Sequence, residues 1–279
     1  MTAPVNERLR DVLYESLDYR LPELPHRYGD QVHLLGNPFL LSQLAVLGAK
    51  GTVQPQVNRL VTLLYEDLVK MVLNHELPRQ QASIPTRMID STPRGLYQGE
   101  VIDRHVRAVT VNIARAGTLP SMVTYDLLNL ALEPGLVRQD HIIMSRMLDE
   151  AESVVGSAIG GAKIGGSVDD AFLLFPDPMG ATGSSLTKAI ELYKTRVPGT
   201  PRRILCINLI VTPEYVRRIT TDHPDVGIYA LRLDRGLSAP DVLATIPGTR
   251  WDEERGLDDR QYIVPGAGGL GEVMNNAYI

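Results

Sequence analysis

Short apolar runs alternate with longer amphipathic stretches along the second half of the chain. The runs are too short for stable helices, and most of the stretches between them carry apolar residues at helical spacing. The predicted strands cover residues 107–114, 141–145, 171–175, 203–211 and 226–233. The predicted helices between them cover residues 122–132, 184–194 and 212–223. Strands that alternate with helices predict an α/β fold, with a mainly parallel sheet covered by helices on both faces.

The first part of the chain has a different pattern. Residues 1–35 are rich in proline and charge, which predicts an N-terminal arm, extended or with short helices. Residues 37–51 and 53–77 carry apolar positions at helical spacing, so two helices are expected before the sheet. The polar segment 78–103 contains several prolines and glycines and predicts irregular or hairpin structure. We expect a single domain over residues 36–279 behind the arm.

One further segment lies between the second and third predicted strands. Residues 148–170 are rich in Gly, Ser and Ala and lack a clear apolar period. This composition predicts a mobile loop or flap.

Composition and charge narrow the classes of partner. The net charge is −5 with no basic block, which argues against a long nucleic acid. No run approaches the roughly 18 apolar residues of a membrane span. The single cysteine, Cys206, lies in an apolar run and excludes an internal disulfide, so we expect a reducing, cytoplasmic location. The six histidines lack metal-ligand spacing, and no metal site built from protein side chains is expected.

Two segments after predicted strands carry chemistry that suits phosphate. Residues 177–185, DPMGATGSS, leave a buried run, pass through small residues and enter an amphipathic helix. Glycines permit close backbone approach, and the first amides of a helix have no partner within it, so this segment predicts a phosphate site. Asp177 places a carboxylate beside it, as a sugar phosphate would require. Arg115 and Gly117, in RAG after another strand, offer a permanent charge and close approach to a diphosphate.

The segment 177–185 closely resembles the phosphoribosyl-diphosphate loop of uracil phosphoribosyltransferases, commonly D-P-M-L-A-T-G-G-S, and differs at Gly180 and Ser184. STPRGLYQGEVIDR (91–104) is similar to the family's T-P-x-G-x-Y-x-G segment, and VNIARAG (111–117) to its I-L-R-A-G segment. NPFLLSQLAVL, HPDVGIYALRLDRGL and YIVPG resemble further family segments in the same order. The resemblance implies a type I phosphoribosyltransferase fold with N-terminal helices and a C-terminal hood formed by about 78–104 and 234–279.

The resemblance also implies roles for individual residues. Arg115, Arg146 and Asp177 are the expected catalytic residues, and Mg²⁺ is expected to bind through the diphosphate of the substrate. The segment SRMLDE replaces the family's Y-R-x-E segment around Arg146. The residues expected to bind phosphoribosyl diphosphate are Arg115, Arg146, Asp177, Pro178, Met179, Gly180, Ala181, Thr182, Gly183, Ser184 and Ser185.

The base-binding segment departs from the family pattern Y-I-(I/V)-P-G-L-G-D. This chain reads YIVPGAGGLGE, and a gapless alignment assigns the base site to Ile263, Gly268, Gly269 and Leu270, with Gly269 in place of the family aspartate. In a shifted alignment, GLGE is the counterpart and Glu272 supplies the carboxylate. The gapless alignment matches the usual tail length better and is preferred.

An insertion of about 20 residues, near 235–254, separates two copies of a similar motif, DRGL and ERGL. It carries the only tryptophan, Trp251. Packing of the insertion onto the body is the more common use of such an aromatic residue, and the alternative is a lid over the base or a partner surface.

The resemblance implies conversion of uracil and phosphoribosyl diphosphate to UMP and diphosphate by a homodimer or higher homo-oligomer. Gly269 and the insertion leave two alternatives open. The chain acts on a different base, or it is a non-catalytic nucleotide-binding regulatory relative.

Overall fold

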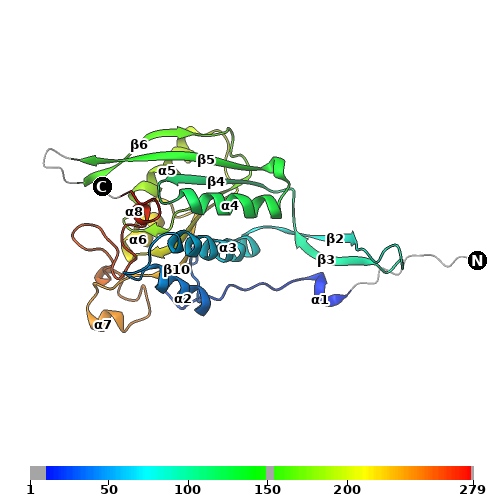
Figure 1. Ribbon diagram of the computed structural model, residues 1–279, viewed down its shortest axis with the longest axis horizontal. Helices are drawn as coiled ribbons and strands as arrows, with labels where there is room; N and C mark the ends of the chain where they lie inside the picture. The colour runs from blue at the N-terminus through cyan, green and yellow to red at the C-terminus, as the bar shows by residue number, and fades with distance from the viewer. Residues whose placement is uncertain (1–10, 149–153, 278–279) are drawn as a thin grey trace, which may run out of the picture.

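The computed structural model describes residues 11–148 and 154–277, without the side chains of residues 145–148 and 154–157. A sheet of eight strands has the order β1-β10-β9-β7-β4-β5-β6, and β8 pairs with β9 (Figure 1). All neighbours are parallel except β5 and β6. The strands are Val32–Leu34 (β1), Arg107–Ala114 (β4), Val137–Leu148 (β5), Val154–Lys163 (β6), Ala171–Pro176 (β7), Met179–Gly180 (β8), Arg203–Val211 (β9) and Val226–Leu233 (β10). The predicted α/β fold is confirmed.

Helices cover both faces of this sheet. The helices are Val12–Glu15 (α1), Pro38–Leu47 (α2), Gln56–Glu76 (α3), Thr118–Ala131 (α4), Ser184–Arg196 (α5), Pro213–Asp222 (α6), Pro240–Leu243 (α7) and Leu270–Val273 (α8), with 3₁₀ turns at Pro134–Leu136 and Trp251–Glu253. Helices α2, α3 and α4 pack in one apolar cluster, whereas α5 and α6 pack in the other. None of the helices in the described residues is long and apolar enough to cross a lipid bilayer.

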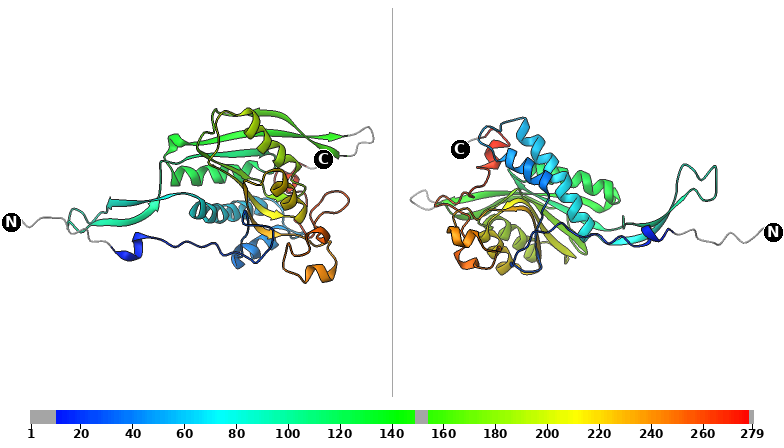
Figure 2. Two further views of the ribbon diagram at one scale, coloured as in Figure 1. Left: turned by 180° about the vertical axis from the view of Figure 1, so that it is seen from behind. Right: turned by 90° about the horizontal axis from the view of Figure 1, so that it is seen from below.

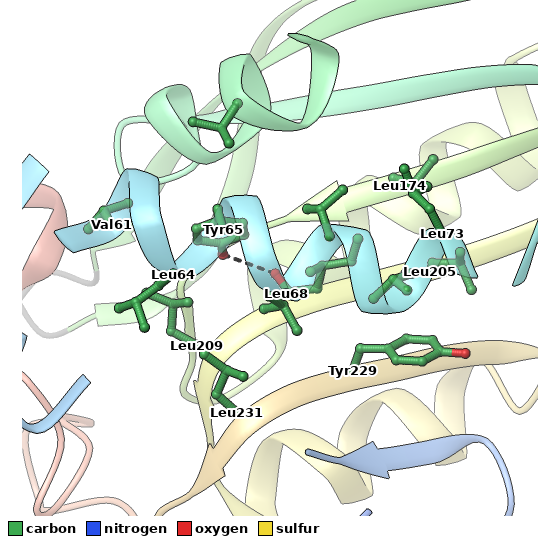
Figure 3. Packing of buried hydrophobic residues seen from close by; sticks show 14 of the residues in the cluster. Val61, Leu64, Tyr65, Leu68, Leu73, Leu174, Leu205, Leu209, Tyr229 and Leu231 are labelled. Carbon is green, nitrogen blue, oxygen red and sulfur yellow. Dashed lines mark hydrogen bonds between the residues drawn. The ribbon is translucent and has the colours of Figure 1, made fainter. Parts of the chain in front are cut away.

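Strand β9 shows why the central strands carry apolar residues on both faces. Leu205, Ile207 and Leu209 belong to the cluster under α3, and Ile204 and Cys206 belong to the cluster under α5 and α6. Successive side chains of a strand point to opposite faces, so a strand covered on both sides buries every residue. Figure 3 shows α3 lying over β9 and β10 in the first cluster.

Two segments differ from the sequence-based expectation. Residues 154–163, predicted as part of a mobile loop or flap, form strand β6, which pairs antiparallel with β5. Pairing along β5 supplies backbone hydrogen bonds that outweigh the weak strand preference of Gly, Ser and Ala; residues 149–153 lie outside the described residues. The predicted arm 1–35 also contributes β1, which extends the sheet beside β10.

The segment 78–104 forms a projecting antiparallel hairpin. Its strands are Arg79–Pro85 (β2) and Leu96–Ile102 (β3), paired along their whole length. The hairpin extends from the body on the side of α1, away from α6, α7 and α8 (Figure 1 and Figure 2). The hairpin prediction is confirmed, but the structure does not bring this segment over the phosphate loop, where a contribution to the hood was expected. The other part expected to form the hood, residues 234–277, lies with α6 at the opposite end of the body from the hairpin (Figure 1).

Candidate functional site

The predicted phosphate loop, residues 177–185, follows β7 and is anchored by the next strand and helix. Met179 and Gly180 form β8 and pair with Ile210 and Val211 of β9. The hydroxyl of Thr212 donates to the carbonyl of Ala181 at 2.7 Å. Because Ile210 and Val211 of β9 are buried, these bonds fix the loop at the carboxyl edge of the sheet, where ligands of parallel sheets collect.

Two glycines of the loop are required by its geometry. Gly183 precedes α5 with φ of +76°, in the left-handed region that favours glycine. A Cβ on Gly180 would lie 2.9 Å from the ring of Tyr215, so a larger residue would displace the loop. The first amides of α5 have no partner within the helix and follow directly, and the hydroxyl of Thr182 accepts a hydrogen bond from the amide of Ser184. This arrangement suits an anion at the start of a 13-residue helix.

Asp177 lies at the end of β7 in a largely apolar setting. Desolvation raises the pKa of its carboxyl group to about 6, against a usual value of 3.8, although a hydrogen bond from the amide of Met179 favours the charged form. The side chain is only partly accessible to solvent. A partly buried carboxylate with a raised pKa is typical of functional sites, because a ligand can supply the hydrogen-bond donors that the protein does not.

Asn208 positions Asp177, and sequence reasoning missed it. Its side-chain amide donates to the carbonyl of Asp177 at 2.6 Å, and its own oxygen accepts from the hydroxyl of Tyr215 at 3.0 Å. Asn208 is fully buried in β9. The available signal was one amide within the apolar run 203–211, since a buried polar side chain requires partners.

Arg115 and Gly117 form a second loop at the same edge. They follow β4, which pairs parallel with β7, so the two loops are neighbours. A Cβ on Gly117 would lie 2.7 Å from the carbonyl oxygen of Ile113, which explains the need for glycine in this turn. The peptide bond between Ala114 and Arg115 is cis. Arg115 is exposed, and its guanidinium donates to the carbonyl of Ala277 at 3.0 Å.

Arg146 lies on β5, the strand beside β4, and its backbone pairs with Ser157 of β6. Its side chain lies outside the described part of the structure. The expected second contact to diphosphate therefore stays a prediction.

The predicted base segment lies against the Arg115 loop. Ile263 is buried and forms a bridge with Leu257, and Leu270 is buried at the start of α8. A Cβ on Gly271 would lie 3.5 Å from the Cβ of Ala116. The structure thus brings the C-terminal segment to the loop that was expected to bind diphosphate.

A charged pair at the end of β10 holds the turn within this segment. Asp234 and Arg232 form two hydrogen bonds of 2.7 and 2.8 Å, and Asp234 is almost fully buried. Asp234 also accepts from the amide of Gly266 at 2.7 Å, and Arg232 donates to the carbonyl of Gly266 at 3.0 Å. Gly266 has a positive φ of 60°, so the pair supports a turn that few other residues could adopt.

We expect Asp234→Asn to lower the free energy of unfolding by about 2 kcal/mol, because it weakens a buried charge-assisted network. Urea unfolding measures the change. The exposed Asp259→Asn, which removes the same charge, serves as the control and should shift stability by less than about 0.5 kcal/mol. Equal stability of the two variants would show that the pair does not support the turn.

The insertion 235–254 is fastened to the body through Glu254 and Trp251. Glu254 is buried and accepts from Tyr28, from Arg235 at 2.9 Å and from the amide of Gly248 at 2.9 Å. Trp251 packs edge-on against Tyr28 at 4.8 Å between ring centroids and donates to the carbonyl of Pro213. These contacts agree with the packing interpretation of Trp251.

A cavity of about 570 Å³ lies between this insertion, helix α6 and the phosphate loop. Thr182 is the member of the predicted site that lines it. Arg217 and Arg218 line the α6 side, each paired with an aspartate. The cavity adjoins the predicted substrate site rather than containing it.

Three comparisons with known proteins agree with this geometry. The sequence profile described as uracil phosphoribosyltransferase matches residues 34–249. The uracil phosphoribosyltransferases of Rhodococcus jostii (strain RHA1) and Variovorax paradoxus (strain S110) are 29% and 28% identical over 244 residues, and both matches cover 86% of this chain and 96% of the relative. The solved structure of the AQ2163 protein from Aquifex aeolicus shares the fold, with a TM-score of 0.66 at 19% identity, covering 89% of this chain and 99% of that chain. Because the profile matches most of its length, the chain belongs to the uracil phosphoribosyltransferase family of transferase enzymes.

Proposed function

We propose that the protein transfers the phosphoribosyl group of phosphoribosyl diphosphate to N1 of uracil, which gives UMP and diphosphate. The observation that carries the proposal is the meeting of three segments at one sheet edge. The phosphate loop and the Arg115 loop follow the paired strands β7 and β4, and the C-terminal segment accepts a hydrogen bond from Arg115 through the carbonyl of Ala277. The named activity of the relatives from Rhodococcus jostii and Variovorax paradoxus supports the same substrates.

Each loop has a distinct part in this reaction. The start of α5 and the hydroxyls of the phosphate loop hold the 5-phosphate, which fixes the ribose in place. The ionised carboxylate of Asp177 accepts hydrogen bonds from the ribose hydroxyls. As the bond from the ribose to diphosphate breaks, negative charge develops on the leaving group, and Arg115 stabilises it.

The donor set at this edge suits Mg²⁺ bound with the diphosphate. Mg²⁺ commonly binds one or two carboxylates together with substrate phosphates. The described residues hold no cluster of three or more acidic, His or Cys side chains that would hold a metal by themselves. Asp177 would be the carboxylate that shares such an ion, which would neutralise part of the charge on the leaving diphosphate.

Calorimetry and turnover with phosphoribosyl diphosphate test the proposal. The purified protein with Mg²⁺ should bind phosphoribosyl diphosphate and release diphosphate only when uracil is added. Absence of diphosphate release with every base tried would contradict the proposal.

A second candidate is transfer to a different base. Two observations favour it: Gly269 replaces the family aspartate, and the insertion 235–254 lies beside the site. A panel of nucleobases with labelled phosphoribosyl diphosphate separates the two candidates. Exclusive use of uracil would end the second.

A further inference from the structure

The space beside Gly269 is filled by the carboxylate of Glu272. A Cβ built on Gly269 would lie 2.6 Å from Oε2 of Glu272 and 3.0 Å from its Cδ. Real Cβ atoms do not approach other atoms so closely, so no side chain at position 269 fits while Glu272 keeps this position. Gly269, which replaces the family aspartate in the gapless alignment, is therefore covered by the carboxylate of Glu272, three residues later in the chain.

The backbone around Glu272 is attached to the Arg115 loop. Its carbonyl accepts from the amides of Asn275 and Ala277, and the carbonyl of Ala277 accepts from Arg115 at 3.0 Å. Gly271 lies against Ala116. On the other side, the side chain of Gln54 donates to the carbonyls of Val273 and Met274. Glu272 is thus held on the same short segment that contacts the Arg115 loop.

The carboxylate of Glu272 is partly buried, and within residues 11–148 and 154–277 it has no hydrogen bond or ion pair. The acceptor sites of this carboxylate are therefore open to a ligand. A substrate that brings an N–H group to this position would donate to it. The neighbouring positions Ile263, Gly268 and Leu270 are those assigned to the base.

We propose that Glu272 supplies the carboxylate that position 269 lacks and accepts a hydrogen bond from a ring N–H of the bound nucleobase. The inference rests on the proposed phosphoribosyl transfer and adds a specificity-determining residue to it. It assigns base recognition to a side chain of α8 and predicts that positions 269 and 272 are interchangeable as carriers of one carboxylate.

Four proteins test this interchange: the wild type, Glu272→Ala, Gly269→Asp and the double variant. Glu272→Ala should raise the KM for the base about tenfold or more and leave the KM for phosphoribosyl diphosphate within about twofold. Gly269→Asp alone should also lose activity, because the new side chain pushes the carboxylate of Glu272 out of its position and adds a like charge beside it. In the double variant the space beside position 269 is free. Its activity should therefore be at least about tenfold higher than that of Glu272→Ala alone.

The same substitution is thus harmful in one background and beneficial in the other, and a merely structural role of Glu272 does not give that reversal. Glu272→Gln keeps the shape of the side chain and should still raise the KM for the base, which guards against a folding defect. Asp259→Asn is the matched charge control. A wild-type KM for the base in Glu272→Gln, or no rescue in the double variant, would overturn the inference.

Binding of the base separates this inference from the proposed function. Uracil and the other bases are titrated by calorimetry into protein saturated with ribose 5-phosphate, which has no leaving group. If the wild type shows no turnover, the proposed function fails, but a base affinity that falls in Glu272→Gln still supports the role of Glu272. A base affinity equal in the wild type and Glu272→Gln overturns that role whether or not turnover occurs.

Discussion

Replacing Arg115 with alanine is expected to lower kcat/KM about a hundredfold, or about 2.7 kcal/mol of transition-state stabilisation. Arg115 follows the carboxyl end of β4, which pairs with β7, the strand that leads into the phosphate loop. Its single described hydrogen bond, to the carbonyl of Ala277, leaves other donors for a diphosphate. Because charge grows on the leaving group as the reaction proceeds, the loss should fall mainly on kcat.

Arg104→Ala is the matched control for this prediction. Arg104 is exposed just before β4, at the opposite end of the strand from Arg115. Steady-state kinetics with varied phosphoribosyl diphosphate should show near-wild-type turnover for Arg104→Ala. Near-wild-type turnover of Arg115→Ala would remove Arg115 from the mechanism.

Asp177→Asn is expected to lower kcat/KM about a hundredfold or more, because an amide cannot replace an ionised carboxylate that accepts ribose hydroxyls. In the wild type, burial raises the pKa of Asp177 to about 6. The affinity for phosphoribosyl diphosphate should therefore fall as the pH is lowered through about 6. The variant lacks this group, so its affinity should fall less steeply over the same range, where only the ligand's own phosphate, with a second pKa of about 6, still titrates. Calorimetry across this pH range measures both proteins.

The same substitution is expected to stabilise the unliganded protein at neutral pH. The folded pKa of Asp177 lies above its unfolded value, so the unfolded state loses its proton first as the pH rises from about 4 to about 6. Ionisation therefore costs stability across this window, by about 3 kcal/mol once it is complete. Asp177→Asn removes that cost.

Urea unfolding at about pH 4 and about pH 8 checks the sign. The stability gain of Asp177→Asn should be present at the higher pH and absent at the lower pH. The exposed Asp259→Asn is the control and should show no such difference. A variant less stable than the wild type at the higher pH would mean that Asp177 contributes to the fold rather than to the site.

The apolar runs in the sequence were sufficient to predict most strands of the sheet. The runs 107–114, 203–211 and 226–233 are mostly apolar because both faces of these strands are covered, and they match β4, β9 and β10. The pattern failed at β6, where Gly, Ser and Ala give no periodic signal and pairing with β5 decides the structure. It also failed at β1, since a strand of three residues is too short to show a period.

Within the site, the sequence identified the residues whose chemistry is local. Asp177, Gly183 and Arg115 occur in short segments whose backbone geometry follows from neighbouring residues. The partners of Asn208, and of the pair formed by Arg232 and Asp234, lie about 30 positions away along the chain. No local spacing in the sequence predicts these contacts.

The sequence by itself determined the family, the alternation of strands and helices, and the two loops at the carboxyl edge of the sheet. Those features depend on residues within a few positions of each other, because neighbouring residues set the apolar pattern of a strand or helix and the backbone conformation of a loop. Only the tertiary structure decided that the hairpin 79–102 points away from the site and that Glu272 occupies the space beside Gly269. Both depend on how distant or turning segments pack in three dimensions, which the order of residues along the chain does not specify.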